Sequence, residues 1–177
     1  LRPRDDLRLI GWGALRELSV PLLNDGGVSK MRDQDEKSIA AAAYWTVTDE
    51  IVLSAGLGLR HFEQTLSDSQ GFPTRIDTFE APVSARYFSP LGWFAGVTWT
   101  WIDQEVEEDG QQSSASPILD AFVGYRLPQR RGMLTLEARN ILDEAFSYQD
   151  DSFRTTELPN PVRLPSRSLI ARLTLSF

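Results

Sequence analysis

The last eleven residues, 167–177, are the feature that most constrains what this chain can fold into. From Leu169 onward apolar residues occupy every second position and polar residues lie between them, with Ile170 as the exception. A period of two is typical of a β-strand whose two faces meet different surroundings. The sequence stops on the apolar side of this strand, at Phe177, which leaves no room for a solvated tail. We therefore expect a strand that closes or borders a sheet.

The same alternation recurs upstream and predicts about eight strands in all. Gly11 and Gly13 blur the faces of the first segment, and alanines on both faces make the second compatible with a helix as well. Pro82 interrupts the fourth, where proline is expected only at a sheet edge or a bulge, because it cannot donate to the ladder. The expected strands cover residues 7–20, 38–47, 51–64, 78–87, 93–103, 117–126, 134–139 and 167–177.

The connections between these segments alternate in length. Short turns are expected at residues 48–50, 89–92 and 127–132, and long polar loops at 21–37, 65–74, 104–116 and 143–165. In an antiparallel meander this puts all short turns at one end, which is the asymmetry of an up-and-down outer-membrane β-barrel. Aromatic residues of the apolar face gather near the strand ends, as in the aromatic girdles of such barrels. The predicted interface aromatics are Trp45, Tyr87, Trp93, Trp99, Trp101 and Tyr125.

The opposite face of the same strands is charged. Two interpretations follow: either this face lines a wet or plugged lumen while the apolar face meets lipid, or it is the outer surface of a soluble barrel. Periodicity does not choose between them, but the loop asymmetry and the aromatic positions favour the membrane. Trp93 and Trp101 lie about 19 Å apart along the normal at a tilt near 45°, comparable to an apolar band of about 25 Å. The predicted lumen charges are Arg60, Glu80, Arg86, Asp120, Arg126, Glu137, Arg139 and Arg172.

Composition excludes several classes of function and of site but does not identify the function. The 177 residues fit a single domain over 1–177, and no apolar run is long enough for a transmembrane helix. The net charge of −7, with Lys30 and Lys37 as the lysines, argues against a nucleic-acid surface. The lack of cysteine excludes disulfides, thiolate metal sites and a cysteine nucleophile. Because the sequence begins at Leu1, we expect a mature form or a piece of something longer.

Two segments near the end resemble a known family. Residues 138–146 read Ala-Arg-Asn-Ile-Leu-Asp-Glu-Ala-Phe, which resembles the penultimate-strand signature of TonB-dependent outer-membrane receptors, Asn-Leu-Phe-Asp followed by a charged residue and an aromatic. Pro165, Ser166 and Arg167 before the alternation are similar to that family's closing strand, normally Pro-Gly-Arg with a terminal Phe. The sequence departs from the signature at Ile141 and Leu142, and it contains neither a plug domain nor a TonB box.

The resemblance implies an antiparallel transmembrane β-barrel in a Gram-negative outer membrane, with its C-terminus periplasmic and about eight strands forming the C-terminal part of a larger barrel. Its implied partners are outer-membrane lipids, the barrel assembly machinery and a periplasmic energy-coupling or scaffold protein. The implied function is uptake or passage of a solute. The alternatives are a structural or export barrel, for example in polysaccharide secretion, and a soluble β-barrel that binds a small apolar ligand. Leu173, Leu175 and Phe177 map onto the signal that the assembly machinery recognises.

No catalytic, cofactor or metal site is expected. His61 is the single histidine, and without cysteine it does not make a typical zinc site; we expect it to pack at an interface or against a loop. No Gly-x-Ser-x-Gly motif places a serine beside His61, so a hydrolase triad is not indicated. The acidic run at residues 103–109 offers oxygen ligands for calcium, but such runs are more often solvated loops.

Overall fold

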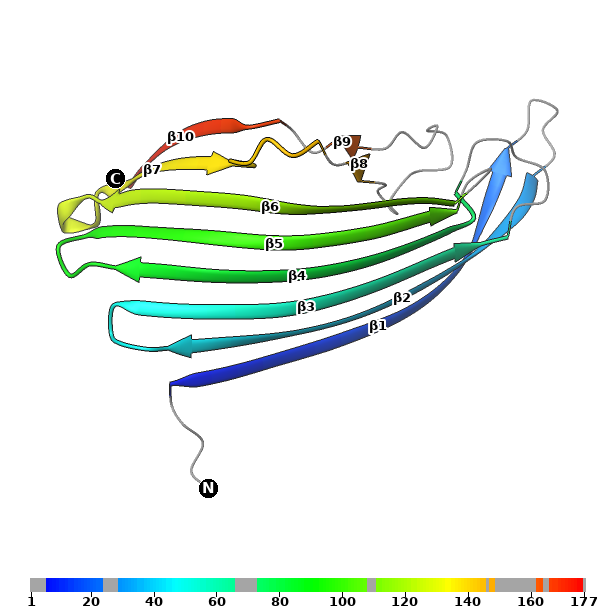
Figure 1. Ribbon diagram of the computed structural model, residues 1–177, viewed down its shortest axis with the longest axis horizontal. Coiled ribbons are helices and arrows are strands. Elements are labelled where there is room, and N and C mark those ends of the chain that lie inside the picture. Colours follow the sequence, from blue (N-terminus) through cyan, green and yellow to red (C-terminus); the bar gives the residue numbers. More distant parts are fainter. Residues whose placement is uncertain are drawn as a thin grey trace, which may run out of the picture.

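The computed structural model describes residues 6–23, 29–65, 73–107, 111–145, 147–148, 162–163 and 166–176. Their main element is an eight-stranded antiparallel sheet in which strands follow one another in chain order up to β7 and then β10 (Figure 1). The predicted all-β, up-and-down architecture is confirmed. The large sheet comprises β1 (Leu7–Leu23), β2 (Ser29–Thr46), β3 (Ile51–Gln64), β4 (Arg75–Phe88), β5 (Trp93–Glu107), β6 (Gln111–Arg126), β7 (Gly132–Arg139) and β10 (Ser168–Leu175).

Two smaller elements accompany the sheet. A 3-10 turn, η1 (Pro128–Arg130), joins β6 to β7, and a two-stranded sheet pairs β8 (Ser147–Tyr148) with β9 (Val162–Arg163). Among the described residues, β1 pairs only with β2, and β10 pairs only with β7, so the large sheet is open rather than closed into a barrel.

Short and long connections lie at opposite ends of the sheet (Figure 1). The short-turn end holds the turns after β2, β4 and β6, each closed by a backbone hydrogen bond such as Val47 N to Ile51 O at 2.9 Å and Ser89 N to Trp93 O at 2.7 Å. The N-terminal start of β1 and the C-terminal end of β10 lie at this end too. We call the other end the long-loop end.

Several strands extend further toward the long-loop end than the sequence pattern predicts. The predicted loops 21–37 and 104–116 are wrong over most of their length, because β1 and β2 pair as far as Leu23 and Ser29, and β5 and β6 as far as Glu107 and Gln111. In β2, β5 and β6 most of the side chains described in these extensions are polar on both faces, so apolar alternation cannot mark them. Backbone pairing continues there regardless, since it does not depend on a buried face.

Pro82 lies in an interior strand, so the expectation of an edge or a bulge is wrong. Its strand, β4, pairs with β5 without interruption and with β3 on the other side. The β3–β4 ladder is broken opposite Pro82 and resumes in the same register, with Ala55 opposite Val83 and Gly58 opposite Glu80. Because the ladder has no pair at this position, the backbone N–H that proline lacks is not needed there. The proline ring packs beside Gly56, where an added Cβ would lie 3.2 Å from Pro82 Cγ.

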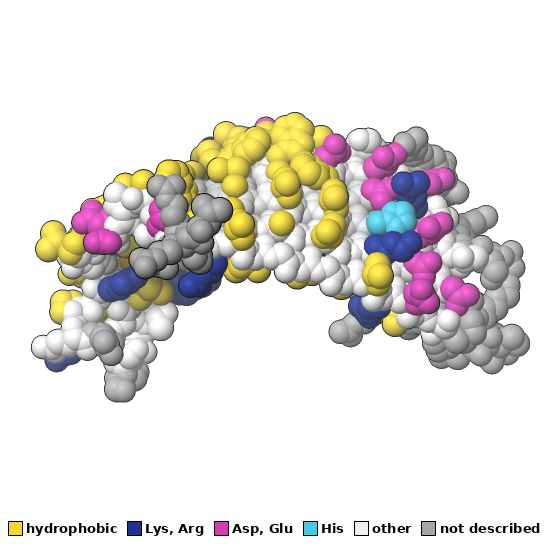
Figure 2. Space-filling view, turned by 90° about the horizontal axis from the view of Figure 1, so that it is seen from below, with side chains coloured by type: hydrophobic (Ala, Val, Ile, Leu, Met, Phe, Trp, Pro, Cys, Tyr) yellow, Lys and Arg dark blue, Asp and Glu magenta, His cyan; other side chains and the backbone are white. Residues whose placement is uncertain are grey.

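The two faces of the sheet differ in exposure. Along β3 the odd-numbered side chains from Ile51 to Leu59 are exposed, while the even-numbered ones between them are partly covered. Cross-strand register continues the exposed row through the odd positions of β1 to β6 and β10, and the even positions of β7. Figure 2 shows hydrophobic side chains along the convex side of the bowed sheet. We call this the convex face and its opposite the concave face.

Phenylalanine rings on the concave face cover glycines of the neighbouring strand. The ring of Phe122 lies over Gly96, where an added Cβ would come within 2.6 Å of it, and the ring of Phe94 lies still closer over Gly124. The two rings are 6.1 Å apart between centroids and tilted by 52°. These ring-over-glycine pairs fix the register of β5 against β6, because a one-residue slip would move both rings to the other face.

Replacing Gly124 with alanine is expected to lower the free energy of unfolding by about 1–3 kcal/mol, since the new Cβ overlaps the Phe94 ring. The matched control is Gly58→Ala on β3, where the nearest atom lies 3.9 Å from the added Cβ and the loss should stay below about 1 kcal/mol. Urea unfolding followed by tryptophan fluorescence measures both. Equal effects at the two glycines would contradict the ring-over-glycine contact.

Candidate functional site

The convex face exposes large apolar side chains over the middle of the sheet. Leu57 is 57% exposed, Val83 51%, Val97 42%, Val123 42% and Leu173 60%, and they come from five different strands. They are therefore not gathered in a closed interior. A contiguous apolar surface of this kind marks contact with a partner or a membrane. We call it the apolar belt.

The apolar belt has a defined border toward the long-loop end. On β3 the apolar side chains of the convex face end at Leu59 and are followed by His61; on β5 they end at Trp101 and are followed by Asp103. On each of these strands the belt covers about nine residues, or about 30 Å along the strand. Because the borders fall at neighbouring register positions, the belt crosses the sheet as one band (Figure 2).

The predicted interface aromatics all lie on the convex face. Trp93 and Tyr125 face each other across β5 and β6, with ring centroids 4.8 Å apart beside the short turns. Trp99 and Trp101 are 6.3 Å apart near the opposite border of the belt. Trp45 and Tyr87 lie one residue before the ends of their strands at the short-turn end, and the indole nitrogen of Trp45 donates to the Asp6 carboxylate at 3.3 Å. Their role at an interface stays a prediction.

The predicted lumen charges all lie on the concave face. Arg60 and Glu80 form an ion pair of 2.5 Å across β3 and β4. Glu137 accepts from Arg139 at 2.9 Å and lies 3.8 Å from Arg172. The remaining three, Asp120, Arg86 and Arg126, have no ion pair with another described residue.

Asp120 has a structural contact that the sequence pattern did not reveal. Its carboxylate accepts the backbone N–H of Asn140 at 2.8 Å, immediately after β7. Asn140 has a positive φ of 48°, and its side-chain amide exchanges two hydrogen bonds with the backbone of Glu144, at 2.9 and 3.0 Å. Asp143 then accepts the backbone N–H of Arg167 at 2.8 Å. The segment that resembles the receptor signature thus forms a hydrogen-bonded turn that ties β7 to β6 and to the start of β10.

The predicted assembly-signal residues are placed only in part. Leu173 and Leu175 lie on the convex face of β10, opposite Leu134 and Gly132 of β7, and both are exposed. Phe177 lies outside the described residues. No described strand pairs with the other edge of β10, so the backbone groups along this edge are available to a further strand.

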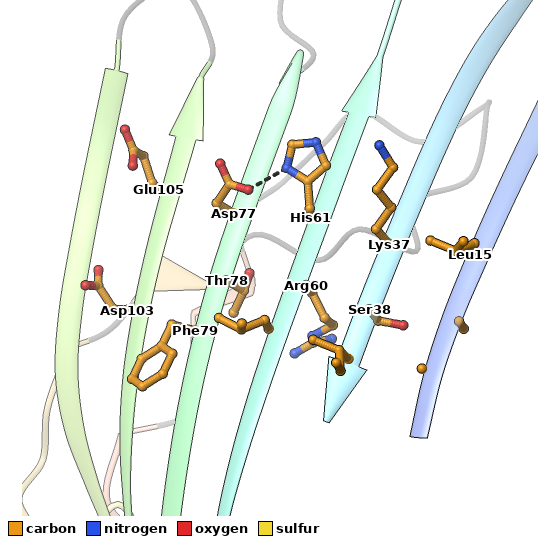
Figure 3. A pocket seen from close by; sticks show the side chains of 14 residues that line it. Leu15, Lys37, Ser38, Arg60, His61, Asp77, Thr78, Phe79, Asp103 and Glu105 are labelled. Carbon is orange, nitrogen blue, oxygen red and sulfur yellow. Dashed lines mark hydrogen bonds and ion pairs between the residues drawn. The ribbon is translucent and has the colours of Figure 1, made fainter. Parts of the chain in front are cut away.

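A hollow of about 960 Å³ lies at the border of the belt, between its last apolar side chains and the charged side chains beyond them (Figure 3). His61 and Asp77 are central, with Nδ1 of His61 2.6 Å from Oδ1 of Asp77. Because a carboxylate only accepts, this nitrogen carries the proton. Arg75 donates to the other oxygen of Asp77 at 2.6 Å, and Nε2 of His61 lies 3.6 Å from Glu63. Each ring nitrogen of His61 thus lies near a carboxylate.

Asp77 lies in the charged part of β4, outside the apolar belt. Burial raises the pKa of its carboxyl group, but the hydrogen bonds from His61 and Arg75 and the electrostatic interactions with them lower it by more, so this pKa lies below the ordinary value. The described part of the chain contains no group of three or more His, Cys, Asp or Glu side chains placed to hold a metal ion. Asp103, Glu105 and Glu107 belong to β5 and not to a loop, whereas residues 108 and 109 lie outside the described residues.

In comparisons with known proteins, no family model, curated protein or solved structure matches this chain. Within the described residues, no helix is long and apolar enough to span a membrane.

Asp77→Asn is expected to destabilise the protein at neutral pH, and the difference from the parent should shrink as pH falls below about 4. The sign follows from the lowered pKa: the ionised carboxylate stabilises the fold above its unfolded pKa, and this stabilisation is lost as pH falls through the lower folded pKa. Urea unfolding of both proteins between pH 3 and 7 measures the difference. A difference that stays constant down to pH 3 would show that the Asp77 charge does not contribute.

Proposed function

We propose that this sheet is part of a transmembrane β-barrel of a Gram-negative outer membrane that provides uptake or passage for a solute, like the barrels of TonB-dependent receptors. The observation that carries the proposal is the exposure of the apolar belt on the convex face together with the ionic side chains on the concave face. In a soluble sheet these faces would be reversed, because water favours the charged side outside. In a membrane barrel the outer face meets hydrocarbon and the inner face meets water.

The dimensions of the apolar belt support this proposal. About nine residues at a tilt of 45° cover about 20 Å along the membrane normal, close to the apolar band of about 25 Å in outer-membrane barrels. Trp93 and Tyr125 at one border and Trp99 and Trp101 near the other fit aromatic girdles. The charged extensions of the strands would then project into water at the long-loop end, and the C-terminal end of β10 would be periplasmic.

Closure of the barrel requires further strand pairing. The open edges of β1 and β10 each present unpaired backbone N–H and C=O groups, which is unfavourable in lipid because nothing there can bond them. We therefore propose that both edges pair with further strands of a larger barrel. The concave face would then form part of the wall of its lumen.

Val97→Arg is expected to destabilise the protein by about 2–4 kcal/mol in phospholipid vesicles, because it places a cation on the face that meets hydrocarbon. The matched control is Thr98→Arg on the adjacent concave position, opposite Asp120, with a loss below about 1 kcal/mol. Denaturant unfolding in vesicles measures both. Equal tolerance at the two positions would contradict the face assignment.

Refolding into detergent micelles is expected to give heat-modifiable gel migration, in which unheated and boiled samples run differently, because a membrane-type sheet stays folded in mild detergent. Circular dichroism before and after heating reports the loss of strand content in the same samples. A protein that is monodisperse in plain buffer, with no shift on heating, would count against lipid contact and in favour of a soluble sheet.

A further inference from the structure

We propose that the solute bound by the concave face is an anion with carboxylate or phosphate groups. The inference rests on the proposed function, because it assigns the substrate class of the same wall. It begins from a difference in charge between the two faces of a chain whose net charge is −7.

The faces carry opposite excess charge among the side chains that the structure describes. On the convex face, beyond the belt, carboxylates outnumber the cations Lys37 and Arg75. On the concave face the cations outnumber the carboxylates, although the chain as a whole is acidic. The convex carboxylates are Glu17, Asp33, Asp35, Glu63, Asp77, Asp103, Glu105 and Glu107; the concave face has Arg8, Arg16, Arg60, Arg86, Arg126, Arg139 and Arg172 against Glu36, Glu80, Asp120 and Glu137.

Most of the concave carboxylates are already engaged within the sheet. Glu36 pairs with Arg16 at 3.2 Å, and Glu80 pairs with Arg60 at 2.5 Å. Glu137 is the carboxylate partner of both Arg139 on β7 and Arg172 on β10, and Asp120 accepts a backbone N–H. Within the described residues, three arginines of this face have no carboxylate at ion-pair distance. These are Arg8, Arg86 and Arg126, and all three are exposed.

The three arginines share one end of the concave face. Arg8 lies at the start of β1, Arg86 near the end of β4 and Arg126 at the end of β6, all at the short-turn end. Figure 2 shows basic side chains on the underside of the bow toward this end. The paired arginines Arg16 and Arg60 lie closer to the long-loop end. An incoming solute would therefore meet neutralised charges first and unpaired guanidinium groups deeper in the wall.

Aromatic rings hold one of these guanidinium groups in place. The Cζ atom of Arg126 lies 5.7 Å from the ring centroids of both Phe88 and Phe94. Phe122 extends the same cluster across Gly96, which is opposite Arg86 in the register of β4 and β5. Arginine stacked on a ring keeps N–H groups free at its edge, where they can bind a planar or tetrahedral anion in bidentate geometry. A cationic solute would instead be repelled from this end of the wall.

Isothermal titration of the whole chain, refolded in a neutral maltoside detergent at about 20 mM salt, tests the inference with citrate and spermidine as probes. Citrate should bind and spermidine should not, because the guanidinium groups attract an anion and repel a polycation, and salt at this concentration screens these interactions only weakly. Arg86→Gln combined with Arg126→Gln should weaken citrate binding by at least about fivefold, while Arg86→Lys with Arg126→Lys should retain most of it.

The matched control removes two cations from the other face, as Lys37→Gln with Arg75→Gln, and should change citrate binding by less than about twofold. Spermidine binding as tight as citrate binding, or an equal loss in the convex control, would overturn the anion assignment. Heat-modifiable migration of the same samples reports membrane-type folding separately. A protein that folds in detergent but does not bind citrate would disprove only the substrate class, whereas one that is folded and monodisperse in plain buffer without detergent would disprove the proposed function.

Discussion

Everything in this structure depends on one ladder of antiparallel backbone hydrogen bonds whose two faces are chemically opposite. The ladder runs without a crossover from β1 to β7 and ends on β10, so each side chain's face is fixed by its position along the strand. Once Leu57 points to the convex side, the register fixes Ala41 and, through β4 and β5, Trp99 on that side as well. The bow of the sheet then crowds the concave side chains and exposes the convex ones.

This arrangement explains why polar side chains are among the most covered in the sheet. Gln104 and Thr78 are buried on the concave face and bonded to each other at 2.9 Å, and Ser84 contacts Ser54 at 2.6 Å. Burial of a polar group is tolerated only when it is hydrogen-bonded, and here each strand supplies the partner of the next. The buried apolar side chains of the described strands, Phe62, Ile76, Phe94 and Ile118, lie on this face too.

The charged residues of the concave face have three different roles. Their shared position on one face does not show which residue has which role. Some are paired across strands, as Arg60 is with Glu80; one, Asp120, holds the turn at Asn140; and others, such as Arg86 and Arg126, have no carboxylate partner among the described residues. This division connects the fold with the proposed function, since paired charges can stabilise the sheet while the unpaired ones would be the groups that recognise a solute in the proposed barrel. It also shows how an acidic chain can present a basic concave face.

The sequence alone determined the strands of the apolar belt, their faces and the short turns, because alternation with a period of two appears wherever the two faces meet different solvents. It failed where both faces are polar, at residues 33–37, 104–107 and 113–116, because no alternation is left to detect although backbone pairing continues. Only the tertiary structure decided which side is convex, which charges are paired and where a ring covers a glycine. Those features depend on the register between strands and the bow of the sheet, which bring together residues far apart in the chain.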